Sequence, residues 1–60
     1  MPSDETRRVL KVFGVAVTNL EDALDQNAPV DEIMQRDREV AERMRELTAL
    51  VDRLRSRRIR

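Results

Sequence analysis

The 60-residue sequence contains no cysteine, histidine, tryptophan or tyrosine, and its one aromatic residue is Phe13. Without cysteine the chain has neither a disulfide nor a thiolate ligand for zinc. Without histidine it cannot build a Ser-His-Asp or Cys-His catalytic site. One glycine and two prolines argue against a β fold with many tight turns. We therefore expect no catalytic, cofactor or metal site and no small-molecule substrate, and we predict that the protein is not an enzyme.

Long hydrophobic runs are also missing. The longest apolar run, Val12 to Val17, follows Lys11 and has six residues. A membrane span needs about 20 residues and the apolar part of a secretory signal about 7–15. We therefore expect a soluble, cytoplasmic protein with no membrane partner.

The strongest positive signal is an alternation of three- and four-residue spacings. Such spacing places residues on one stripe of a helix, at positions a and d of a seven-residue repeat labelled a to g. In the first half the stripe contains Thr6, Leu10, Phe13, Val17, Leu20 and Leu24. In the second half it contains Val30, Ile33, Asp37, Val40, Met44, Leu47, Val51 and Leu54. The pattern predicts two helices.

A single interruption separates the two stripes. Pro29 lacks a backbone N–H and disfavours helical geometry at Ala28, while it suits the first turn of a new helix. Ser3 is a good N-cap for the first helix. We predict one all-α domain over residues 1–60, an antiparallel two-helix hairpin. Its parts are helix 1 at about 4–25, a loop at 26–28, helix 2 at about 29–57 and a basic tail at 58–60.

An alternative places a strand at residues 9–15. This segment is rich in β-branched residues, and Thr18 to Glu21 matches a capping box that would start a new helix there. A strand followed by two helices would resemble the ribbon–helix–helix repressors, which are dimeric DNA-binding proteins. Against it, Val9 and Leu10 are adjacent, so the segment does not alternate cleanly between apolar and polar residues.

Helix 1 carries more apolar surface than one neighbouring helix can cover. Val9, Ala16 and Ala23 fall at position g, and Val12 and Val15 fall at c and f, so the helix is apolar on almost every side between residues 9 and 17. We therefore expect a homodimer, in which two hairpins form a four-helix bundle. Its predicted core consists of Leu10, Phe13, Val17, Leu20, Leu24, Ile33, Val40, Met44, Leu47 and Val51. Asp37, at position a, either reaches water or is buried and fixes the register.

Charge is balanced overall but divided along the predicted hairpin. Twelve acidic residues match twelve basic ones, so no net charge draws the chain to nucleic acid. Residues 21–35 contain five acidic residues and no basic one, whereas the two chain ends are rich in arginine. An antiparallel dimer would place the acidic loop of one hairpin near the basic end of the other.

These features favour a small helical protein–protein interaction module of adaptor, docking, co-chaperone or inhibitor type. A candidate partner patch is formed by Val9, Val12, Val15 and Ala16. The alternative is a dimeric nucleic-acid-binding regulator, whose contacts to an anionic partner would be Arg53, Arg55, Arg57, Arg58 and Arg60. In hairpin length and expected dimeric arrangement the chain resembles the Rop-type plasmid copy-number regulators. That resemblance covers both helices, includes no shared residue motif and assigns no site.

Overall fold

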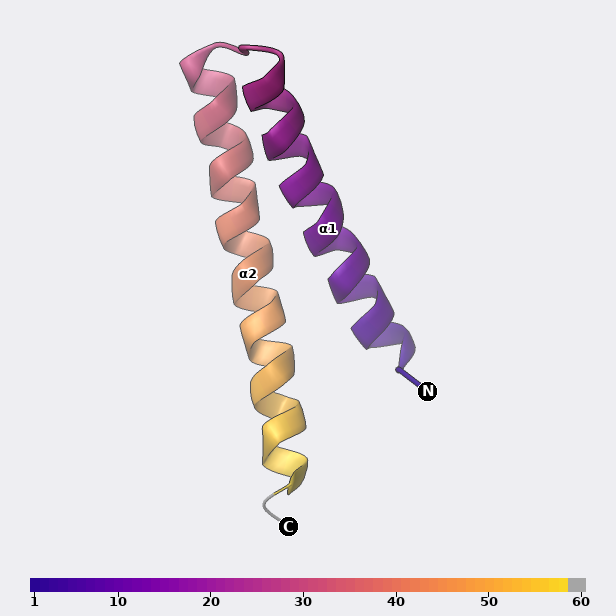
Figure 1. Cartoon of the computed structure of the whole chain (residues 1–60). Helices are drawn as coiled ribbons and strands as arrows, with labels where there is room; N and C mark the ends of the chain where they lie inside the picture. The colour runs from indigo at the N-terminus through magenta and orange to yellow at the C-terminus, as the bar shows by residue number, and fades with distance from the viewer. Residues whose placement is uncertain (59–60) are drawn as a thin grey trace.

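The computed structural model describes residues 1–58 and contains two helices that run side by side in opposite directions (Figure 1). Helix α1 spans Asp4–Asp25 and helix α2 spans Val30–Arg58. The helices lie closest near the turn that joins them and diverge toward the end that carries both termini (Figure 1). The predicted all-helical hairpin is confirmed.

Local signals in the sequence set the ends of both helices. The Ser3 Oγ accepts a hydrogen bond from the Thr6 N–H at 3.1 Å and so caps α1. Asn27 adopts a left-handed conformation, with φ of 54°, and reverses the chain. The Pro29 carbonyl then accepts hydrogen bonds from the N–H groups of Glu32 and Ile33. Helix α2 therefore begins at Val30, one residue later than expected, because Pro29 occupies the capping position.

The alternative strand at residues 9–15 is wrong, because this whole segment is helical. The Thr18 Oγ1 donates to the Gly14 carbonyl at 2.9 Å inside α1, rather than capping a new helix. A helix brings Val9 and Ala16, seven residues apart, onto the same side, where both are buried against α2. A strand would have split this apolar segment between two faces.

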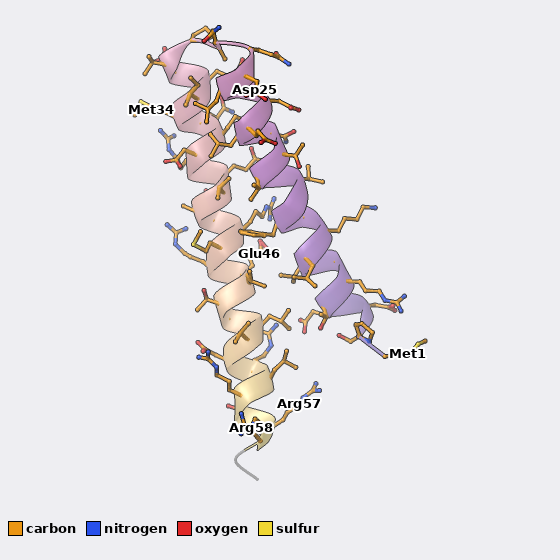
Figure 2. All side chains as sticks on the ribbon, in the orientation of Figure 1. Met1, Asp25, Met34, Glu46, Arg57 and Arg58 are labelled. Atoms are coloured by element: carbon orange, nitrogen blue, oxygen red, sulfur yellow. The ribbon has the colours of Figure 1, made fainter. Side chains whose placement is uncertain are left out.

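The seam between the helices does not follow the predicted a and d stripe. Its buried residues are Val9, Ala16 and Ala23 from α1 and Leu50 from α2, all at position g. Short side chains on α1 let the two backbones approach closely. The corresponding positions on α2 include Arg36 and Arg43, whose half-buried side chains reach Glu39 at 3.5 Å and Glu46 at 2.6 Å. Glu46 lies on the side of α2 that faces α1 (Figure 2).

This seam predicts that added bulk at Ala16 destabilises the hairpin. Ala16→Leu should lower the free energy of unfolding in urea by about 1–3 kcal/mol, because the extra atoms have no space between the helices. Ala49→Leu is the matched control, since Ala49 is exposed within α2. It should change the free energy of unfolding by less than about 0.5 kcal/mol. Equal effects at the two positions would show that Ala16 does not lie in the seam.

Candidate protein-interaction face

The ten residues predicted as a dimer core remain partly or fully uncovered in the single hairpin. Leu10, Val17 and Leu24, at position a of α1, keep 52%, 41% and 53% of their surface exposed. Met44 on α2 is exposed to a similar extent. The other six are half-buried along the edge of the seam, namely Phe13, Leu20, Ile33, Val40, Leu47 and Val51. Packing α1 on α2 thus buries the residues at position g, whereas the residues at positions a and d remain available for another contact.

Both uncovered stripes lie on the same side of the hairpin. Going round either helix from g, position d is reached after about 50° and position a after about 100°. The helices are antiparallel and meet through the same position. The rotation from g to d and a therefore leads to the same side of the pair on both helices. We call this side the apolar face. It consists of Leu10, Phe13, Val17, Leu20, Leu24, Val30, Ile33, Val40, Met44, Leu47, Val51 and Leu54.

Asp37 is an acidic residue within the apolar face. Its side chain is exposed in the hairpin. It lines a shallow hollow on α2, together with Val40, Ala41, Met44, Arg45 and Thr48. Because the side chains of Ala41 and Thr48 are small, they protrude little from α2, and another helix could approach its backbone here.

The predicted partner patch is not a continuous exposed surface. Val9 and Ala16 are buried between the helices, Val12 is half-buried, and Val15 alone is as exposed as Leu10. The prediction was wrong for Val9 and Ala16 because both lie at position g, which forms the seam. It assumed that the helices met through a and d, which would have turned g outward.

The C-terminal arginines occupy the open end of the hairpin. Arg53 binds Glu5 at 3.1 Å, the one ion pair between α1 and α2 within residues 1–58. Arg55 pairs with Asp52 at 3.8 Å, and Arg57 and Arg58 are exposed on the last turn of α2 (Figure 2). Arg60 lies outside the described residues. Contact of this end with nucleic acid or an acidic protein stays a prediction.

The opposite end of the hairpin is acidic. Asp25 lies at its tip (Figure 2), near Asp31 and Glu32 in the first turn of α2. Within the described part of the chain, no three acidic side chains come close enough to hold a metal ion. This end therefore contributes a diffuse negative charge, about 30–40 Å from the arginines of the open end by helix length.

The chain matches no protein-family model, no curated protein and no solved structure. Within residues 1–58, neither helix is both long enough and apolar enough to cross a membrane.

The position of Asp37 predicts that its charge weakens any contact that covers the apolar face. Asp37→Leu should tighten self-association by at least about tenfold, because a carboxylate no longer loses its water when the face is covered. Sedimentation equilibrium measures the dissociation constant. Glu42→Leu adds the same side chain at an exposed position away from the face and should leave the constant nearly unchanged. Equal tightening by both variants would contradict the assignment of Asp37 to the contact.

Proposed function

We propose that this chain is a small, non-enzymatic helical interaction module, of adaptor, docking, co-chaperone or inhibitor type, that self-associates through its apolar face. The observation that carries the proposal is the uncovered a and d stripe on both helices. Large aliphatic side chains such as Leu10 and Leu24 remain more than half exposed, while alanines occupy the buried seam. A contiguous apolar surface of this kind is typical of a protein-binding site.

The surface area of the hairpin supports the same proposal. The chain exposes 5085 Å². A compact monomer of 7.0 kDa is expected to expose about 4,000 Å². The excess, about 1,000 Å², is close to the roughly 800 Å² that each partner buries in a standard protein–protein interface. Covering one face with another protein would bring the chain to the exposure of an ordinary folded domain.

Several hydroxyl groups already serve the local helix structure. The Ser3 and Thr6 hydroxyls lie 3.0 Å apart at the start of α1, and the Thr18 hydroxyl bonds the Gly14 carbonyl. These groups therefore stabilise the helical structure of α1.

The proposal predicts that a charge on the apolar face abolishes association. Leu10→Glu should raise the dissociation constant by at least about a hundredfold, because a charged group cannot be buried there without a partner. Val15→Glu is the matched control on the same helix. Both side chains are 52% exposed in the hairpin, but Val15 lies at position f, away from the apolar face. Sedimentation equilibrium and circular dichroism measure association and helix content.

The result expected is loss of association for Leu10→Glu and wild-type behaviour for Val15→Glu. If Val15→Glu alone dissociated the protein, the working surface would be the outer side of α1 and the proposal would fail. Equal, small effects of both variants would show that neither surface takes part in association.

A further inference from the structure

We propose that the apolar face is covered by a second copy of this chain that runs in the opposite direction, with α1 packed on the α1 of the second copy and Gly14 at the two-fold axis. This inference rests on the proposed function and names its partner and orientation. Its support comes from a row of exposed residues that the hairpin itself leaves unused.

Two identical hairpins can join face to face by a two-fold axis in only two ways. If the axis runs along the helices, both loops lie at the same end and α1 faces the second copy's α2. If the axis crosses the helices, the loops lie at opposite ends and each helix faces its own counterpart. The side chains along the edges of the apolar face distinguish these two arrangements.

The outer edge of the face on α1 is formed by position e, about 150° round from the seam. Its residues are Arg7, Gly14 and Glu21, and all three are exposed. When α1 is paired antiparallel with itself about Gly14, Arg7 of each copy lies opposite Glu21 of the other. This arrangement forms two equivalent ion pairs and places glycine next to glycine at the centre. Neither Arg7 nor Glu21 has an ion-pair partner elsewhere in residues 1–58.

Gly14 suits a close contact between two helices. It costs α1 about 1 kcal/mol of helix propensity relative to alanine. Within the hairpin no close contact requires glycine at this position, because a Cβ built on Gly14 would meet no atom within 4 Å. At the two-fold axis, the missing side chain would let the two α1 backbones approach each other.

The edge residues of α2 are compatible with the same axis. Position e of α2 contains Met34, Ala41, Thr48 and Arg55. This row is centred between Met44 and Arg45, so Ala41 would face Thr48 of the second copy, and Met34 would face the aliphatic part of Arg55. Small residues again lie nearest the centre, beside the shallow hollow at Ala41 and Thr48.

An ion pair between the two helices places these two centres at nearly the same height. Glu5 of α1 binds Arg53 of α2 at 3.1 Å. Nine residues further toward the turn along each helix are Gly14 and Met44. One two-fold axis therefore passes through the centre of both edge rows, although each row comes from a different helix.

The arrangement with both loops at one end brings like charges together. In that case Glu21 would be level with Asp37 of the second copy, and Arg7 would lie one helical turn, about 6 Å, from its Arg55. The two Asp37 residues would also be at the same height. In the antiparallel arrangement the two Asp37 residues lie about 21 Å apart along the direction of the helices, at a rise of 1.5 Å per residue. The acidic turn of each copy then lies near the basic open end of the other.

Reversing the charge at Arg7 or Glu21 distinguishes the two orientations, because the dissociation constant should rise in one and fall in the other. Arg7→Glu and Glu21→Arg should each raise the dissociation constant by about tenfold at low salt, since each change replaces two attractions with two repulsions. The double variant should return to within about threefold of the wild type. Both single changes also suit the helix dipole of α1, an acid near its start and a base near its end, so weaker association cannot come from a weaker helix.

The matched controls are Arg8→Glu and Asp22→Arg, which make the same charge changes one residue away, at exposed positions outside the face. They should shift the dissociation constant by less than about threefold. The inference is overturned if Arg7→Glu tightens association, as the other orientation requires, or if the double variant is not restored.

Cross-linking provides a second test, because the chain has no native cysteine. Under oxidation Gly14→Cys should form a covalent dimer, whereas Val15→Cys, at an exposed position off the face, should not. A protein with the mass of a dimer but no Gly14→Cys cross-link would overturn the orientation and leave the proposed function standing. A protein that stays monomeric at micromolar concentration would overturn both.

Discussion

Two packed helices can cover only one side of each other, and in this hairpin the covered side of α1 carries its smallest apolar residues. Ala16 and Ala23 lie in the seam, while Leu10 and Leu24 remain more than half exposed. Burying one leucine contributes about 1.5–3 kcal/mol. The hairpin alone therefore leaves much of its hydrophobic stabilisation unused, in a chain whose single core is expected to supply only about 3–5 kcal/mol.

Charge has a different role from the apolar surface. Within α2, Arg36 and Arg43 are half-buried at position g, and their charged ends pair with Glu39 and Glu46. The aliphatic part of a half-buried arginine typically covers apolar surface while its charged end stays in contact with water. Partly exposed ion pairs of this kind contribute little to stability. In the proposed dimer, charged residues along the edges would instead decide which orientation forms.

The two helices and the turn were predictable because their signals are local. Ser3 caps α1, Pro29 interrupts the repeat, and the spacing of the apolar residues fits helices throughout. The residues of the seam were not predictable in the same way. Between residues 9 and 17 α1 is apolar on nearly every side, so periodicity gives a helix but does not say which side meets α2. The decisive property is size, because alanine at position g allows closer packing than leucine at a. Arg36 and Arg43 in the seam of α2 gave no apolar signal at all.

Whether a second copy of the chain covers the apolar face can be tested without any substitution. Sedimentation equilibrium of the unmodified protein over a range of micromolar concentrations tests it most directly. The proposed dimer should have a mass twice the 7.0 kDa of the chain, with dissociation promoted by raised salt. A well-folded, fully helical protein with the mass of a single chain at every concentration would contradict it.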